Sequence, residues 1–67
     1  MTFSENLLLL RKENGLKQTE VAKSLGIGVR AYQHYEYGQR EPQLSTLIKL
    51  AQLYNISLDE LVFGKKL

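Results

Sequence analysis

Apolar residues recur along the chain at intervals of three and four, and no segment alternates apolar with polar residues as a strand would. Glycines and a proline interrupt this pattern: Gly15, Gly26 and Gly38 each follow an apolar segment, and Pro42 precedes another. The pattern predicts an all-α fold, a compact bundle of five short helices with short connections. The expected ranges are about Phe3 to Asn14, Gln18 to Leu25, Val29 to Tyr37, Leu44 to Tyr54 and Leu58 to Phe63.

The same spacing predicts which side chains of the fourth helix enter the core. We expect an inward stripe made of Leu44, Leu47, Ile48 and Ala51. Tyr54 follows at the end of this helix, and we expect its ring to lie in the core with its hydroxyl directed outward.

The expected helix starts differ in how well they are capped. Ser57 and Glu60 have the spacing of a capping box, in which each side chain accepts a hydrogen bond from the other's backbone amide. Gly28, Lys17 and Gln43 precede the third, second and fourth helices and have no capping hydroxyl. We therefore expect these three helix starts to be the weaker ones.

Composition narrows the possible functions. The chain has 67 residues, 43% hydrophobic and 24% charged, which is typical of one globular domain over residues 1–67. It has no cysteine and one histidine, His34, which excludes disulfides, thiolate sites and multi-histidine metal sites. We therefore expect no metal and no cofactor. No apolar run approaches the roughly 20 residues of a membrane span, and no secretion signal is visible, so a cytoplasmic location is expected.

Charge suggests where a polyanion would bind. The net charge is +2, which is compatible with a nucleic-acid partner without requiring one. Basic residues gather in the middle third of the chain, at Lys17, Lys23, Arg30 and Arg40. Any surface that faces a polyanion is therefore expected there.

The segment between Gln18 and Glu36 has the spacing of a helix-turn-helix. Two short helices flank the turn 26–28, and a turn of this length holds its helices at roughly 90–120° to each other. Ala22 is small enough for the second helix to cross closely, and Gly26 tolerates a positive φ angle. Tyr32, six residues after Gly26, supplies the apolar contact between the two helices.

Several short motifs in a fixed order extend this pattern over most of the chain, and the sequence resembles the Cro/cI-like helix-turn-helix family, also called the xenobiotic response element family. The motifs that carry the resemblance are Leu7-x-x-Leu10-Arg11, Asn14-Gly15-Leu16-x-Gln18, Val21-Ala22-x-x-Leu25-Gly26-Ile27, Tyr35-Glu36-x-Gly38, Glu41-Pro42, Leu47-x-x-Leu50-Ala51 and Ser57-Leu58-x-x-Leu61. The resemblance implies a lambda-repressor-like bundle of five helices with the third helix in the major groove of DNA. It also implies an internal ion pair between Arg11 and Glu36.

The resemblance further implies which residues meet DNA. The expected base contacts are Gly28, Val29, Arg30, Gln33 and His34. Among them, Arg30 has the fork that suits guanine and Gln33 the amide that suits adenine. The expected phosphate contacts are Lys17, Gln18, Thr19, Tyr37, Gln39 and Arg40. Ordinary surface positions remain the alternative for His34 and Tyr37, and Lys23 fits either reading.

These observations predict a sequence-specific transcriptional regulator that binds double-stranded DNA, with repression as the favoured action. We expect a homodimer, because one recognition helix gives modest affinity. The expected dimer surface is Leu53, Leu58, Val62 and Phe63. The sequence leaves open the operator, the effector and whether the chain is a complete regulator or an N-terminal module of one.

A different function on the same fold is a protein-interaction or antitoxin-type module. Leu8 and Leu9 favour it, because the family usually has polar residues at these positions. Catalysis is not expected, since Ser24, His34 and Asp59 belong to no catalytic motif.

Overall fold

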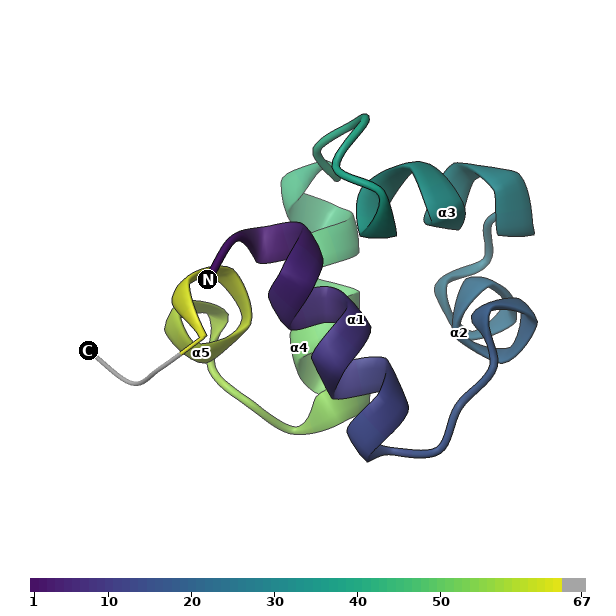
Figure 1. The fold of residues 1–67 in the computed structure, drawn as a ribbon. Helices are drawn as coiled ribbons and strands as arrows, with labels where there is room; N and C mark the ends of the chain where they lie inside the picture. The colour runs from purple at the N-terminus through teal and green to yellow at the C-terminus, as the bar shows by residue number, and fades with distance from the viewer. Residues whose placement is uncertain (65–67) are drawn as a thin grey trace.

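The computed structural model describes residues 1–64, which form five helices (Figure 1). They are α1 (Phe3–Glu13), α2 (Gln18–Leu25), α3 (Val29–Glu36), α4 (Leu44–Tyr54) and α5 (Leu58–Phe63). The sequence-based ranges differ only at two ends, because Asn14 and Tyr37 are the C-caps of α1 and α3 rather than their last residues. The expected domain also includes residues 65–67, which lie outside the described residues.

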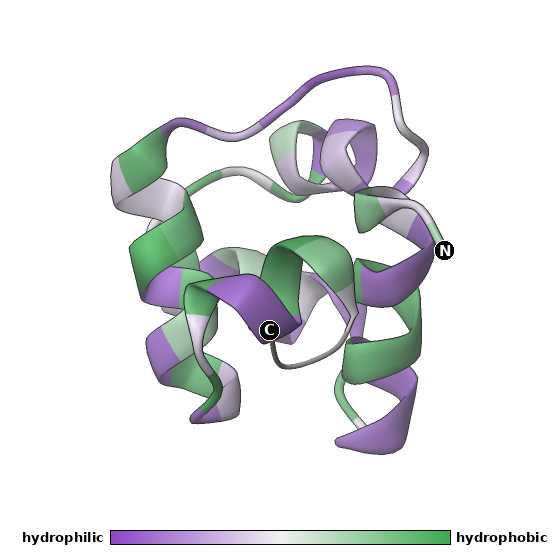
Figure 2. Cartoon of the chain, turned by 90° about the vertical axis from the view of Figure 1, so that its left-hand side faces the viewer, coloured by the Kyte–Doolittle hydropathy of each residue, from purple (hydrophilic) through white to green (hydrophobic). Residues whose placement is uncertain are grey.

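The helices pack around one small core. α3 lies against α2 and α1, while α5 lies against α1 and α4 (Figures 1 and 2). Figure 2 shows α5 between α1 and α4, with hydrophobic residues on all three helices. The side chains without accessible surface come from every helix: Leu7, Val21, Tyr32, Leu50 and Leu61. Within residues 1–64, no helix has both the length and the apolar character to cross a membrane.

The capping contacts at the helix starts agree with the expected ones. Ser57 and Glu60 form the expected capping box at α5, and Thr2 and Glu5 form a second one at α1 that the sequence analysis did not identify. The residues Lys17, Gly28 and Gln43 make no side-chain capping hydrogen bond, as expected.

The inward face of α4 differs from the expected stripe. Leu44 is 63% exposed and Ile48 is 41% exposed, so both lie on the outer side of the helix. Leu50, Ala51 and Tyr54 are buried and Leu47 is partly buried against them. Both stripes have helical spacing and share Leu47 and Ala51. The structure selects the one that buries the large ring of Tyr54, because it removes more apolar surface from water.

The expectation for the Tyr54 hydroxyl is also wrong. This hydroxyl is buried, and within residues 1–64 it has no hydrogen-bond partner. Burial raises the pKa of Tyr54 to about 12, and the nearby Glu36 carboxylate adds to the increase. The ring belongs to the core because α4 is rotated to bury it.

Replacing Tyr54 by phenylalanine is expected to stabilise the protein by about 1 kcal/mol, because it removes a buried hydroxyl without a partner. Urea unfolding followed by circular dichroism measures the change. The matched variant Tyr32→Phe removes a hydroxyl that does donate a hydrogen bond, to Glu36, so it is expected to lower the stability. A loss of stability in Tyr54→Phe as large as that in Tyr32→Phe contradicts this interpretation.

Candidate nucleic-acid interface

A tight turn sets the position of α3 relative to α2. Gly26 has a φ angle of 72°, in the left-handed region that suits glycine. The next amide, of Ile27, turns back and donates to the Ala22 carbonyl at 3.1 Å. Ala22 is only 2% exposed, and α3 packs against α2. The chain therefore leaves α2 in a direction that carries α3 across it.

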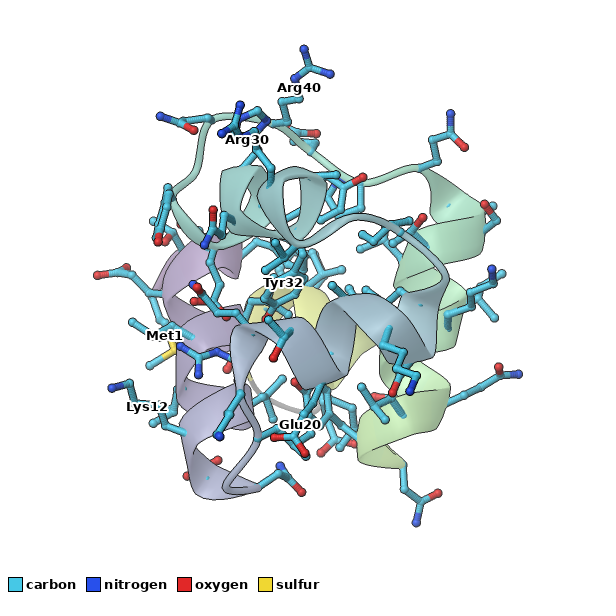
Figure 3. All side chains as sticks on the ribbon, turned by 90° about the vertical axis from the view of Figure 1, so that its right-hand side faces the viewer. Met1, Lys12, Glu20, Arg30, Tyr32 and Arg40 are labelled. Carbon is cyan, nitrogen blue, oxygen red and sulfur yellow. The ribbon has the colours of Figure 1, made fainter. Side chains whose placement is uncertain are left out.

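The two sides of α3 have different roles. Tyr32 and Glu36 are buried, and Figure 3 shows Tyr32 pointing into the molecule. Arg30 and Tyr37 are exposed, and Gln33 and His34 are half-buried. At about 100° per residue, these four positions form one stripe opposite Tyr32. An exposed stripe of polar and aromatic side chains on a well-packed helix is suited to contact another molecule.

A hydrogen-bond network around Glu36 holds the inner side of α3. The guanidinium of Arg11 donates to both carboxylate oxygens, from Nε at 2.6 Å and from Nη2 at 3.2 Å. The Tyr32 hydroxyl donates at 2.5 Å and the Gln18 amide at 3.1 Å. Arg11 also donates to the Leu16 carbonyl. The Arg11–Glu36 ion pair is thus present, and it connects α1, α2 and α3.

Glu36 is ionised although it is buried. Burial by itself would raise the pKa of its carboxyl, but the hydrogen bonds from Arg11, Tyr32 and Gln18 outweigh that effect and lower the pKa below its ordinary value. Burial also raises the pKa of Tyr32, as does its bond to Glu36. The network therefore contains a carboxylate and a neutral phenol under ordinary conditions.

The network extends to the outer side of α3 through Gln18. Its amide oxygen accepts from the Gln33 side chain at 3.0 Å, and its amide nitrogen also approaches the Tyr37 hydroxyl at 3.4 Å. The side chain of Gln18 is therefore occupied within the protein, although it was expected to contact phosphate. Gln33 is oriented by α2 rather than free to rotate, which lowers the entropy cost of placing it against a partner.

The remaining expected DNA contacts lie on the surface near α2 and α3. Lys17, Thr19, Gly28, Val29, Gln39 and Arg40 are all exposed. Arg30 and Arg40 extend from the same edge of the molecule in Figure 3. The backbone amides of Gln39 and Arg40 donate to the His34 carbonyl at 2.9 and 3.2 Å, which ties the loop after α3 to the end of that helix.

The other predicted surfaces are only partly exposed. Of the expected dimer residues, Leu58 and Phe63 are exposed at α5, while Leu53 and Val62 are half-buried. Leu53 packs against the core. Leu8 and Leu9 are both exposed on α1.

Asn6 is a structural residue that the sequence analysis missed. It is 5% exposed, and its amide donates to the carbonyls of Glu60 and Leu61 at 2.9 and 2.8 Å. This side chain attaches α1 to α5. The signal was a polar residue on the inward side of the first predicted helix, which spacing alone reveals but whose partners it does not identify.

The ion pair leads to a stability prediction. Glu36→Gln is expected to destabilise the protein by about 3 kcal/mol, because Arg11 then loses its charged partner in a mostly buried position. Urea unfolding at neutral pH measures the loss, and Glu13→Gln, at an exposed carboxyl of α1, is the control with little effect. A loss no larger than that of the control contradicts the structural role.

The lowered pKa of Glu36 also predicts how stability changes with pH. The contribution of Glu36 is present above its ordinary pKa of 4.5 and is lost as the pH falls through the lower pKa of the folded state. We expect the unfolding free energy of the wild-type protein to fall in acid, and the fall to be smaller in Glu36→Gln. Equal acid sensitivity in the two proteins contradicts the lowered pKa.

Comparison with known proteins identifies the family of the chain. The helix-turn-helix family HTH_3 matches residues 7–61. The uncharacterized HTH-type transcriptional regulator YqaE of Bacillus subtilis (strain 168) is 46% identical over 63 residues, which are 94% of this chain and 54% of that protein. The cryptic phage CTXphi transcriptional repressor RstR of Vibrio cholerae is 43% identical over 60 residues, which are 90% of this chain and 54% of that protein. The chain therefore spans about half the length of these relatives.

A solved structure confirms the expected fold. The P22 c2 repressor protein, crystallised in complex with a synthetic operator, matches with a TM-score of 0.89 at 25% identity, over 97% of this chain and 98% of that chain. The likeness includes all five helices in a lambda-repressor-like arrangement. With the family match over most of its residues, the chain belongs to the Cro/cI-like helix-turn-helix family.

Proposed function

We propose that this chain is the sequence-specific DNA-binding part of a transcriptional regulator, a repressor, with α3 as the helix that enters the major groove. One domain over residues 1–67 would perform this function. The similar proteins YqaE and RstR are named as a transcriptional regulator and a transcriptional repressor, and the P22 c2 repressor was crystallised with an operator. We propose binding without a catalytic step, and action in the cytoplasm, where the DNA of a bacterial or phage operator lies.

The observation that carries this proposal is the contrast between the two sides of α3. The buried network around Glu36 fixes the helix, while the side chain of Arg30 is exposed and makes no hydrogen bond among residues 1–64. Recognition of bases requires donors held on a rigid element that fits the groove, which is about 12 Å wide. In this arrangement Arg30 would read guanine, and Gln33, oriented by Gln18, would read adenine. Gly28, Val29 and His34 would complete the base contacts.

Phosphate contacts would hold the protein in register on both sides of α3. Lys17 and Thr19 lie at the start of α2, where the free amides of the first turn favour an anion. Gln39 and Arg40 lie in the loop that is bonded back to His34. Tyr37 lies between these groups on the outer stripe. The side chain of Gln18 is already occupied, so any phosphate contact of Gln18 would use its backbone amide.

Two arginine variants separate base reading from phosphate binding. Arg30→Ala is expected to cost about 1–3 kcal/mol on the preferred duplex and to relax specificity at one position. Arg40→Ala is expected to weaken all duplexes alike and to lower the salt slope by about 1. Mobility shifts at several salt concentrations measure both, after selection of a preferred duplex from a random pool.

Lys49→Ala is the matched control for lost positive charge. Its Nζ lies 3.5 Å from the Leu25 carbonyl, within the protein, so its removal should leave specificity unchanged. If Arg30→Ala and Lys49→Ala bind the selected duplex equally well, α3 does not read the sequence. Wild-type affinity that does not change between low and high salt contradicts phosphate contact altogether.

We also propose that the protein binds DNA as a homodimer, with half-site centres about 34–36 Å apart. The exposed Leu58 and Phe63 support a contact at α5, with Leu53 and Val62 beside them. Phe63→Lys is expected to reduce affinity for a duplex with two half-sites and to leave affinity for one half-site unchanged. Sedimentation with each duplex measures this, and a single copy on the two-site duplex in the wild-type protein contradicts the dimer.

A protein contact at α1 is the second candidate function. Leu8 and Leu9 are 38% and 41% exposed at adjacent positions, which favours an interaction surface there. In a protein-interaction or antitoxin-type module, variants of Arg30 and Gln33 would lose DNA binding and retain binding to the protein partner.

A further inference from the structure

The outer side of α1 carries two leucines between opposite charges. Glu5, Leu8, Leu9 and Lys12, together with Met1, line a shallow hollow of about 370 Å³. Figure 2 shows the hydrophobic middle of α1 between more hydrophilic ends. Figure 1 shows α1 in front of α4, and in Figure 3 α1 lies along the left edge of the molecule with no other helix outside it. Glu5, Leu8, Leu9 and Lys12 define the α1 face.

The order of residues on the α1 face is symmetric. Glu5 precedes Leu8 by three residues, and Lys12 follows Leu9 by three. At 3.6 residues per turn, Glu5 and Lys12 lie within about 20° of the same line along the helix. Leu8 then lies on one side of that line and Leu9 on the other. Reversing the direction of the helix therefore leaves the leucines in the middle and exchanges the two charges.

This symmetry makes the α1 face complementary to itself. In an antiparallel pair related by a two-fold axis level with the middle of the α1 face, Glu5 of each copy lies opposite Lys12 of the other. Leu8 meets the second copy's Leu8, and Leu9 meets the second copy's Leu9. Such a contact is isologous, so it closes after two copies. Opposite charges that match in this orientation, and clash when the helices are parallel, also select the antiparallel register.

The charges on the α1 face are available for this contact. The Lys12 side chain is exposed, and its ammonium makes no hydrogen bond or ion pair among residues 1–64. Glu5 uses one carboxylate oxygen for the Thr2 backbone amide, at 2.8 Å, and the other oxygen has no bond among these residues. That capping bond holds the carboxylate at the start of α1.

We propose that α1 pairs antiparallel with α1 of a second copy of this chain, through Leu8 and Leu9 flanked by two Glu5–Lys12 ion pairs. The contact does not depend on DNA binding by α3, since Arg30 and Arg40 lie at another edge of the molecule (Figure 3). A stable dimer buries about 800 Å² per partner, which is a large fraction of the 4561 Å² surface of this small domain. A contact through one helix face buries less surface than this, so we expect the two copies to associate weakly. Covalent trapping of the pair is the best measurement of such an association.

Disulfide trapping tests the contact directly, because the chain has no cysteine of its own. Leu9→Cys places a thiol beside the two-fold axis, opposite the same thiol of the second copy. Glu13→Cys places one on the same helix, exposed but away from the α1 face. Under mild oxidation Leu9→Cys is expected to form a linked dimer faster than Glu13→Cys. Equal rates overturn the proposal, and the α1 face then belongs to a different protein or to solvent.

Charge reversal tests the register. In the Leu9→Cys protein, Lys12→Glu and Glu5→Lys are each expected to slow trapping about tenfold, because two attractions become repulsions. A mixture of the two variants restores both ion pairs across the heterodimer, so cross-linking between them is expected to recover the rate of Leu9→Cys alone. Lys12→Glu leaves the Thr2–Glu5 cap intact, and circular dichroism verifies that each variant is folded.

Three results overturn the proposed register. They are an unchanged rate in Lys12→Glu, no recovery in the mixture, and equal slowing by Glu13→Lys, which changes the charge off the α1 face. Phe63→Lys is expected to leave trapping unchanged, because the contact does not use α5. A loss of trapping in that variant would show that α1 meets its copy only as a consequence of a dimer at α5.

Discussion

The charged contact between Arg11 and Glu36 is the interaction on which the arrangement of this small protein most depends. A carboxylate is costly to bury, and this one is tolerated because a guanidinium, a phenol and an amide all donate to it. Each donor comes from a different place in the chain: Arg11 from α1, Gln18 from α2 and Tyr32 from α3 itself. Because an unpaired charge in this position is so unfavourable, the three helices are confined to the geometry that satisfies it.

That geometry also orients the outer side of α3. The Gln18 amide bonds to Glu36 on one side and to Gln33 on the other, so the buried carboxylate and the exposed stripe share one chain of hydrogen bonds. Gly26 directs the chain into α3, and the network then fixes the rotation of that helix. The side chains that we propose to meet DNA are thus held by contacts that also stabilise the fold. A domain of this size has few buried residues, so some of them both stabilise the fold and orient α3.

The small core leaves apolar side chains on the surface, and the reason for their exposure differs from one site to another. Leu44 and Ile48 are exposed because α4 is rotated to bury Leu50 and Tyr54. Leu8 and Leu9 lie on the outer face of α1 between charges of opposite sign. Reversing the helix direction keeps the leucines in the middle and exchanges the two charges. Chemical symmetry, and not exposure alone, is the reason to assign a second copy to the α1 face.

Local signals in the sequence determined the helices, their ends and the helix-turn-helix spacing, because glycine turns, capping residues and apolar spacing act over a few neighbouring residues. The resemblance to the family also implied the Arg11–Glu36 pair. Tertiary packing alone decided the rotation of α4, the burial of the Tyr54 hydroxyl, the occupation of Gln18 and the attachment of Asn6 to α5. Each of these depends on which side chains from distant segments compete for the same space and the same hydrogen bonds. Helical spacing limits a helix to a few rotations, and only the neighbouring helices select one of them.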